Sequence, residues 1–345
     1  MLTPKERLFK VLKNENVDRP PCICPGGMMN MIIEELMDIS KINWPEAHSD
    51  GKLMADLAYS MYENGGFENC GVPFCMTVEA EAMGAVVSLG NKINEPRVTN
   101  YAINSITDYK SLNNIDLNKG RVKAGLDSIK ILSERDLDIP IIANITGPIS
   151  LASSMMDPIN FYKDLVRKKE EAHKYMEVVT ENLITFGRAQ LQAGAEVLAI
   201  SDPSGTGEIL GPKLFNEFAI FYINKIVEAL RPYAKGGIIV HICGKLKSVY
   251  KSLQNLECDA ISFDSITSVK EVKENVKGRA IMGNVSTLTL CKGEEKIIKN
   301  ISNYCIKNGV DILSPACGLG TTTPLNNIKV MVEEARNLSF KVIEI

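Results

Sequence analysis

From residue 139 onward the chain alternates short apolar runs with longer charged segments, and this alternation limits the folds that it can adopt. The apolar runs are rich in Ile, Val and Ala and span 139–147, 195–203, 236–244, 259–266, 279–286 and 310–318. The segments between them have helical periodicity and span 160–192, 212–231, 245–256, 268–276, 294–308 and 325–338. Strands that alternate with helices form βαβ units, so the pattern predicts a parallel sheet covered by helices.

Two segments upstream supply two further strand candidates, 18–27 and 67–75, with a predicted helix over 45–64 between them. Eight strands favour a closed (β/α)8 barrel, and an open doubly wound sheet is the alternative. No glycine-rich dinucleotide fingerprint follows any of the strands, which weighs against the open sheet. A length of 345 residues suits one α/β barrel. We therefore expect a single barrel domain over 1–345, in which residues 1–130 include capping helices.

Charge and hydropathy exclude several classes of partner. The formal net charge is −3 and the chain has no cluster of Lys or Arg, which excludes the electrostatic footprint of a nucleic-acid-binding protein. The same balance provides no polybasic membrane patch. No apolar run approaches the ~18 residues of a membrane span. We expect a cytoplasmic protein whose nine cysteines are reduced.

The stretch "GGIIVHICGK" places His241 and Cys243 two residues apart near the end of a predicted strand. Residues i and i+2 of a strand point to the same side, so both side chains can aim at one point. Cys317 ends another predicted strand, in "DILSPACG". The carboxyl ends of barrel strands form one rim, where catalytic groups lie. One imidazole and two thiolates are a good donor set for zinc, and the alternative is that all three are ordinary core residues.

Polar residues near other strand ends are candidates for the substrate pocket. Asp202 ends the strand in "AISDPSGTGEIL", and Glu208 follows in the same loop. Each is interpreted as a metal ligand, a partner of His241 or a substrate contact, against helix capping or turn formation as the alternative. Cys75 in "VPFCM" is a further candidate for the pocket. For Asp264, in "ISFDS", capping is favoured.

Other candidates carry less weight. The methionines at positions 28, 29 and 31 offer a flexible apolar surface that suits a large cofactor face or simple core filling. His173 lies within the charged stretch "RKKEEAHKYME", which favours a solvated surface position.

Several stretches together resemble a known family. They are "TPKERLFKVLKNENVDRPP" at the start, "VPFCMTVEAEAMGA", "ITGPISLAS", "MGNVS", and H-x-C followed much later by "SPACGLGTTTPLNNIK". These stretches, which run over nearly the whole chain, are similar to the uroporphyrinogen decarboxylase superfamily. The H-x-C and the distant Cys resemble its zinc-dependent branch of methylcobamide:coenzyme M methyltransferases.

The resemblance implies a (β/α)8 barrel that holds zinc at its carboxyl-terminal mouth through His241, Cys243 and Cys317. It also implies a reaction in which a methyl group passes from a methylated corrinoid to a zinc-activated thiol. The corrinoid is carried on a separate small protein, because no histidine of this chain has the context of a cobalt ligand. A zinc-bound thiol is deprotonated, whereas a free thiol has a pKa near ~8.5.

The resemblance leaves alternatives open. The acceptor is coenzyme M or tetrahydrofolate, and Asp202 and Asn284 would serve a pterin. Asn284 also belongs to the "GNVS" pattern of the superfamily, so it discriminates poorly. A decarboxylase is disfavoured because the segment "CICPGGMMNM" is apolar and no arginine follows Arg19 until Arg97. A non-catalytic subunit that binds a corrinoid protein is the remaining hypothesis.

Overall fold

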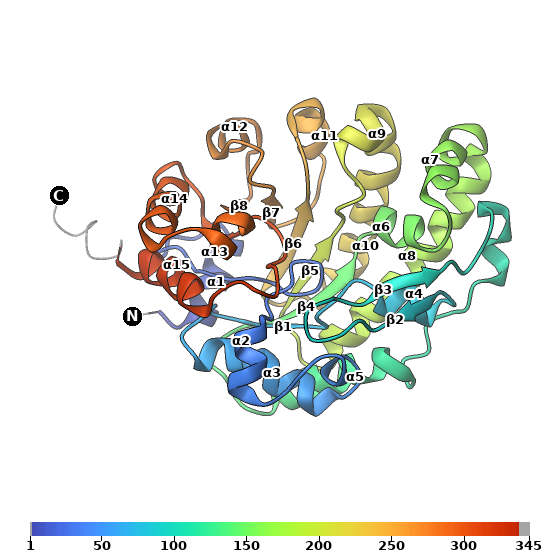
Figure 1. Ribbon diagram of the computed structural model, residues 1–345. Helices are drawn as coiled ribbons and strands as arrows, with labels where there is room; N and C mark the ends of the chain where they lie inside the picture. The colour runs from blue at the N-terminus through green and yellow to red at the C-terminus, as the bar shows by residue number, and fades with distance from the viewer. Residues whose placement is uncertain (1, 338–345) are drawn as a thin grey trace.

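A seven-stranded parallel sheet forms the centre of the molecule, which is described over residues 2–337 of a computed structural model (Figure 1). The strand order is β1-β4-β5-β6-β7-β8-β9, so that each strand pairs with the next one along the chain. The strands are β1 Cys70–Val72, β4 Ile141–Thr146, β5 Val197–Ser201, β6 Gly237–Ile242, β7 Ala260–Phe263, β8 Ala280–Val285 and β9 Ile312–Pro315. A separate antiparallel hairpin is made by β2 Val86–Ser88 and β3 Arg97–Asn100.

Residues 21–23 lie between β9 and β1 and close the sheet into a barrel without forming a regular strand. Cys22 makes a parallel bridge to Leu313 on β9. The backbone N–H of Ile23 donates to the Leu313 carbonyl at 3.1 Å, and on the other side Glu68 N–H donates to the Cys22 carbonyl at 2.9 Å. The predicted α/β barrel is therefore confirmed, with an irregular segment in the place of its eighth strand.

Helices surround the sheet (Figure 1). The α-helices are α1 Pro4–Leu12, α2 Glu34–Ser40, α3 Gly51–Glu63, α4 Val78–Ala82, α5 Gly120–Ser133, α6 Pro148–Ser154, α7 Pro158–Arg167, α8 Lys169–Gln192, α9 Gly207–Leu214, α10 Phe221–Leu230, α11 Tyr250–Leu253, α12 Val269–Asn275, α13 Thr287–Lys292, α14 Glu295–Lys307 and α15 Leu325–Asn337. Shorter helical turns are η1 Glu46–His48, η2 Ile106–Ser111, η3 Phe215–Ile220 and η4 Lys247–Val249. Within residues 2–337, no helix has both the length and the apolar character that crossing a bilayer requires.

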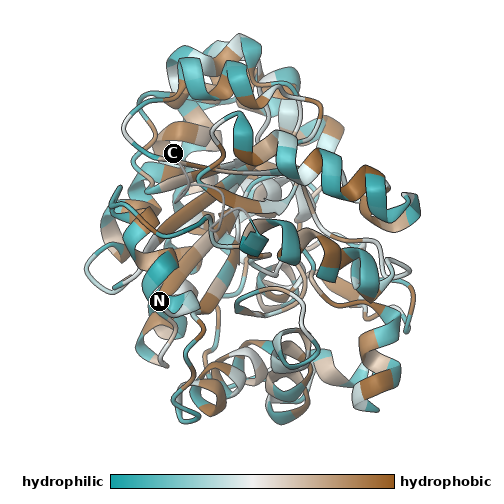
Figure 2. Ribbon diagram, turned by 90° about the vertical axis from the view of Figure 1, so that its left-hand side faces the viewer, coloured by the Kyte–Doolittle hydropathy of each residue, from teal (hydrophilic) through white to brown (hydrophobic). Residues whose placement is uncertain are grey.

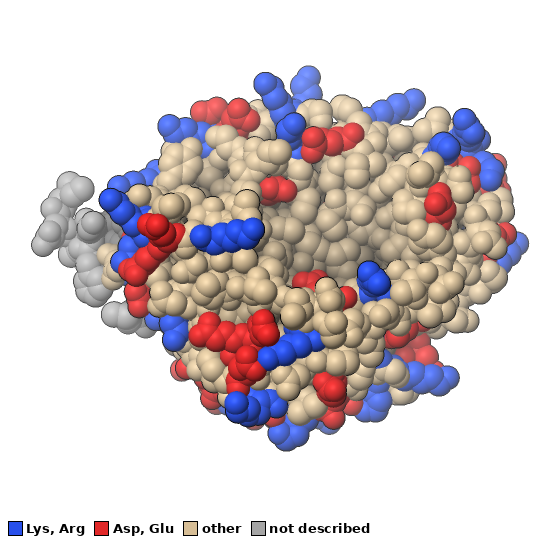
Figure 3. Space-filling model, in the orientation of Figure 1, with Lys and Arg blue, Asp and Glu red and all other residues tan. Residues whose placement is uncertain are grey.

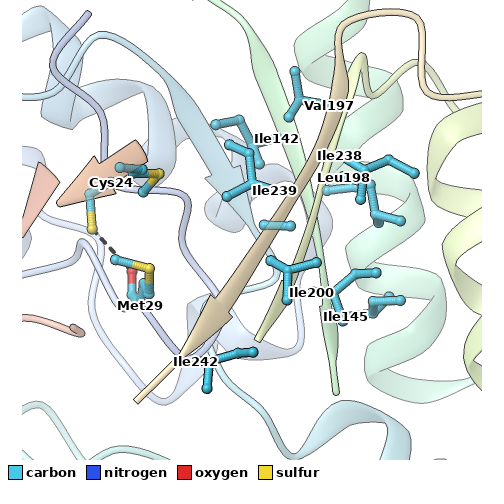
Figure 4. Packing of buried hydrophobic residues seen from close by; sticks show 14 of the residues in the cluster. Cys24, Met29, Ile142, Ile145, Val197, Leu198, Ile200, Ile238, Ile239 and Ile242 are labelled. Carbon is cyan, nitrogen blue, oxygen red and sulfur yellow. Dashed lines mark hydrogen bonds between the residues drawn. The ribbon is translucent and has the colours of Figure 1, made fainter. Parts of the chain in front are cut away.

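The core lies on both faces of the strands. Every residue of β4 and β5 is buried, as parallel strands covered by helices require. Figure 4 shows isoleucine, leucine and valine side chains of β4, β5 and β6 on both sides of these strands. In Figure 2 the central strands are mostly brown, while the outer helices alternate brown and teal. This pattern explains why the strands appear in the sequence as continuous apolar runs.

Several predicted elements differ from the structure. The predicted helix over 45–64 is the turn η1 followed by α3, and the one over 245–256 is the turn η4 followed by the short α11. The segment 18–27 makes only the bridge at Cys22, because its prolines have no N–H to donate and its glycines leave the extended conformation. The predicted helix over 160–192 is two helices, α7 and α8, which meet at Lys168, where the backbone leaves the helical region. The predicted helix over 212–231 begins earlier, at α9, and continues through the π-helical turn η3 into α10.

Closure of the barrel depends on one buried carboxylate. Glu68 accepts hydrogen bonds from Arg19 Nη2 at 2.5 Å, from Arg19 Nη1 at 2.9 Å and from the Cys22 backbone N–H at 3.1 Å. Its side chain is only 1% exposed. The pair therefore joins the closing segment to the residues just before β1.

We expect Glu68→Gln to lower the free energy of unfolding by about 3 kcal/mol, because it leaves the largely buried Arg19 guanidinium without its counter-charge. Denaturant unfolding followed by circular dichroism measures this loss. The control is Glu15→Gln, which breaks the exposed pair between Lys10 and Glu15 and should leave the free energy of unfolding nearly unchanged. Equal small losses in the two variants would show that Glu68 does not hold the barrel closed.

Candidate metal centre

His241 is the penultimate residue of β6 and points into the barrel, where it is 1% exposed. In the sheet register it lies opposite Ser262 of β7. The two side chains make a hydrogen bond of 2.8 Å between Nδ1 and Oγ. The other ring nitrogen, Nε2, faces Cys243 Sγ at 3.0 Å. The hydrogen bond to Ser262 therefore orients the imidazole so that Nε2 is directed at the cysteines.

Cys243 and Cys317 bring their sulfur atoms together at 3.8 Å, although 74 positions separate them in the chain. Cys243 follows β6 directly, and Cys317 lies two residues after β9. The donor atoms of His241, Cys243 and Cys317 all lie within 4.8 Å of one another. Within residues 2–337 this is the one group of at least three His, Cys, Asp or Glu side chains with the spacing of a metal site.

The pKa values of the two thiols in this cluster are shifted in opposite directions. A hydrogen bond with Cys243, followed by one with His241, lowers the pKa of Cys317 well below its ordinary value. The hydrogen bond with Cys317, followed by burial, raises the pKa of Cys243. A coupled pair of this kind loses one proton readily and the second reluctantly. These surroundings therefore favour the thiolate form of Cys317, which is the form of cysteine that binds metal ions.

Asp202 lies outside this cluster and caps a helix instead. It is fully buried and accepts hydrogen bonds from Ser150 Oγ at 2.6 Å, Ser150 N at 2.8 Å and Ile149 N at 3.2 Å. These donors belong to the first turn of α6, whose free N–H groups need acceptors. Burial raises the pKa of Asp202 in spite of these bonds.

The hydrogen-bond partner of His241 is instead Ser262, a residue that the sequence did not mark as a candidate.

Glu208 lies beside the cluster. Its Oε2 accepts a hydrogen bond from the Lys245 backbone N–H at 3.0 Å, so it contacts the turn that follows Cys243. Its side chain is about half exposed, and its Oε1 lies 3.8 Å from Lys245 Nζ. Glu208 is thus near the mouth of the barrel but is not one of the clustered donors.

Asn284 and Cys75 are directed at other neighbours. Asn284 donates to the carbonyls of Asp264 and Thr267 at 3.0 and 2.8 Å, and it accepts from Cys305 of α14 at 3.6 Å. Its amide therefore contacts the outer helix layer rather than His241. Cys75 Sγ accepts a hydrogen bond from Arg121 Nη1 at 3.2 Å.

The remaining histidine examined in the sequence is less exposed than expected. His173 stacks on Phe218 and hydrogen-bonds Tyr222 and Glu217, which leaves its side chain 35% exposed. His173 therefore lies at the surface as predicted but is only partly solvated, because Phe218 of η3 and Tyr222 of α10 cover one side of its ring.

The β2–β3 hairpin approaches the cluster from outside the sheet. Thr321 Oγ1 donates to the Ile93 carbonyl at 2.9 Å, which ties the hairpin loop to the segment after Cys317. The pKa of Glu95 is raised to about 7, first because the surrounding protein takes the carboxyl group out of water and second because of negative charge on Cys317. Part of the Glu95 side chain remains exposed. Glu95 was not among the predicted site residues, because no strand end or motif marks it.

A hollow opens on the face shown in Figure 3, over the region where Figure 1 draws β5 and β6. Its visible walls are mostly uncharged, and most Lys, Arg, Asp and Glu side chains lie at the periphery of this view. A barrel whose carboxyl-terminal strand ends gather thiol and imidazole groups belongs to the class of α/β-barrel enzymes.

The chain belongs to the uroporphyrinogen decarboxylase (URO-D) family, whose model matches residues 3–338. It is 32% identical to the methylcobamide:CoM methyltransferase MtbA of Methanosarcina acetivorans, over 98% of this chain and 99% of that protein. It is 33% identical to MtaA, the methylcobamide:CoM methyltransferase of Methanosarcina barkeri, over 96% of each chain. The family predicted from the motifs is therefore confirmed.

A solved structure of a methyltransferase from Methanosarcina mazei matches with a TM-score of 0.90 and 31% identity, over 98% of this chain and 99% of that one. A B12-independent methionine synthase from Shewanella matches with a TM-score of 0.58 and 12% identity, over 94% of this chain and 100% of that one. The second likeness shows a shared barrel fold alone.

The contacts of Asp202 predict that it stabilises the fold and not the cluster. We expect Asp202→Asn to lower the free energy of unfolding by about 1–3 kcal/mol, because buried hydrogen bonds from α6 lose their charged acceptor. Ser150→Ala should cost less in the Asp202→Asn background than in the wild type, with a coupling of at least about 0.5 kcal/mol. Denaturant unfolding of the double-mutant cycle measures the coupling, and strict additivity would contradict the capping role.

Proposed function

We propose that this protein transfers a methyl group from a methylated corrinoid, carried on a separate protein, to an acceptor thiol of the coenzyme M type. In this proposal His241, Cys243 and Cys317 hold a zinc ion. The observation that carries it is the convergence of one imidazole nitrogen and two thiol sulfurs within 4.8 Å at the mouth of the barrel. The methylcobamide:CoM methyltransferases that match over nearly the full chain support the same reaction class.

The donor set fits zinc in chemistry, and its two sulfur atoms have the spacing of zinc ligands. Zinc prefers Cys sulfur and His nitrogen in a tetrahedral arrangement, with Zn–S bonds of about 2.3 Å. Two sulfur ligands of such a tetrahedron are about 3.8 Å apart, and the sulfurs of Cys243 and Cys317 are 3.8 Å apart. Three protein donors leave one position for a substrate, as catalytic zinc sites do.

When bound there, zinc would supply the Lewis acidity that keeps an acceptor thiol deprotonated at neutral pH. The acceptor thiolate would form a bond to the methyl carbon as the carbon–cobalt bond breaks and its electron pair remains on cobalt. In this proposal Ser262 holds the His241 imidazole in orientation through the 2.8 Å hydrogen bond. The weakly charged hollow of Figure 3 suits the apolar face of a corrinoid that a partner protein presents.

The structure gives less support to the other candidate reactions. The two side chains that would serve a pterin, Asp202 and Asn284, are hydrogen-bonded to α6 and to the loop after β7. A porphyrinogen decarboxylase needs cations for several carboxylates, whereas Arg19 is paired with the buried Glu68. A thiol acceptor therefore remains the proposal, and tetrahydrofolate is an arm of its test.

The test offers free methylcob(III)alamin to the purified protein with coenzyme M, homocysteine or tetrahydrofolate, and follows cob(I)alamin by absorbance. Zinc content is measured on the same samples of wild type and Cys317→Ala. We expect one equivalent of zinc in the wild type, turnover with a thiol, and loss of zinc and activity in Cys317→Ala. Turnover with tetrahydrofolate alone would replace the thiol acceptor. Zinc without any demethylation would favour a non-catalytic partner subunit, and absence of both would refute the mechanism.

Ser262 provides a second test that depends on metal binding alone. We expect Ser262→Ala to weaken zinc affinity by 10–100-fold, because loss of the hydrogen-bond partner of a ligating imidazole has effects of this size. Competition with a chromophoric chelator measures the affinity. Ser265→Ala is the matched control, since Ser265 is in the exposed loop after β7 and hydrogen-bonds only Asp264 among described side chains. Equal affinities in both variants would remove Ser262 from the site.

A further inference from the structure

Residues 25–30 form a loop that is fixed to opposite parts of the barrel mouth. At its start, Asn144 of β4 donates to the Pro25 carbonyl at 2.8 Å. The Gly27 N–H donates to the Pro73 carbonyl, just after β1, at 3.0 Å. At its end, the Asn30 carbonyl accepts from the Leu319 N–H at 2.8 Å, in the segment that carries Cys317. The loop is therefore anchored on both sides of the candidate metal centre.

A tight turn within this loop sets the directions of two methionines. The Met29 carbonyl accepts from the Gly26 N–H at 3.2 Å and from Cys24 Sγ at 3.1 Å, the second of which is drawn in Figure 4. Gly26 and Gly27 have φ values of 95° and 60°, which favour glycine. A Cβ on Gly27 would also lie 2.8 Å from Asn144 Cβ. The turn is therefore built for glycine and holds one shape.

The two methionines of the turn contact different parts of the metal centre. Met29 is fully buried, and its Sδ lies 3.6 Å from Ser262 Oγ. Met28 is only partly buried, and its Sδ lies 3.6 Å from Cys317 Sγ. Close packing keeps the segments together, because a Cβ on Gly318 would lie 2.5 Å from the Met28 carbonyl oxygen. Met29 thus packs behind His241, while Met28 adjoins a candidate ligand on the accessible side.

We propose that the Met28 thioether is the fourth donor to the metal in the absence of substrate and that the acceptor thiol displaces it. This inference rests on the proposed function, because it assumes zinc at His241, Cys243 and Cys317. The sulfur atoms of Met28 and Cys317 are 3.6 Å apart, close to the edge of about 3.8 Å between two sulfur ligands of tetrahedral zinc. Thioether sulfur is a soft donor of the kind that zinc accepts.

Charge and mobility explain why the acceptor thiol would displace the Met28 thioether from the metal. Two thiolates already balance the charge of a divalent ion, and a neutral thioether binds without adding charge. An anionic thiolate is the stronger donor and replaces it. The methionine side chain has three rotatable bonds, and Met28 is only partly buried, so its thioether can swing away from the cluster.

The test uses selenomethionine-labelled holoprotein and X-ray absorption at the zinc edge, which distinguishes selenium from sulfur neighbours. We expect a selenium neighbour of zinc in the labelled wild type and in Met29→Leu, and none in Met28→Leu. Leucine keeps the volume and the apolar character of the side chain, so the fold should be retained. Addition of coenzyme M to the labelled wild type should remove the selenium neighbour and add a sulfur one.

The outcomes separate the inference from the proposed function. Labelled wild type that binds no zinc refutes the proposed function itself. Zinc that binds with no selenium neighbour in the wild type overturns the role of Met28 and leaves the three-ligand site intact. A selenium neighbour that persists when coenzyme M is bound overturns displacement and makes Met28 a permanent ligand.

Discussion

The carboxylate of Glu68 joins the two ends of the sheet, and the position of every group at the barrel mouth depends on this closure. It binds Arg19 and the Cys22 N–H on the closing segment, next to the start of β1. Neighbouring strands are about 4.8 Å apart, so that in a flat sheet β6 and β9, three places apart in strand order, would be separated by about 14 Å. The curvature of the closed barrel and the inward direction of the side chains bring Cys243 and Cys317 to 3.8 Å.

The sequence was most informative where the chain is regular. His241 lies in β6 and Cys243 follows it directly, and their two-residue spacing predicted that both side chains point to the same side, where Nε2 and Sγ are 3.0 Å apart. Cys317 was predicted to join them because parallel strands end at a common rim. Asp202 and Asn284 also follow or lie in strands, yet their partners are N–H and carbonyl groups on neighbouring loops and helices. Such contacts depend on tertiary packing, which strand periodicity does not contain.

The closing segment was the least predictable part of the barrel. A strand over 18–27 was expected because eight strands complete the fold, but Pro21 and Pro25 have no N–H to donate and Gly26 and Gly27 have positive φ. The backbone consequently leaves the ladder and turns over the mouth. Outside a regular strand, side chains do not alternate between the two faces, so the sequence does not predict which ones point inward. The contact between Met28 and Cys317 could therefore be found only in the structure.

Among the cysteines of this chain, the surroundings and not the residue type decide which sulfur atoms are suited to a metal. Burial raises the pKa of Cys70 and of Cys258 to about 12, and that of Cys24 still further, so these thiols stay protonated and pack as small apolar side chains. Cys317 is also largely buried, but hydrogen bonds from Cys243 and His241 lower its pKa. A cysteine must lose its proton before it binds a metal ion. A site that lowers the pKa of one thiol therefore makes metal binding more favourable at neutral pH. The same barrel therefore holds unreactive thiols in its wall and, at its mouth, a cysteine whose surroundings favour the thiolate, 3.6 Å from the sulfur atom of Met28.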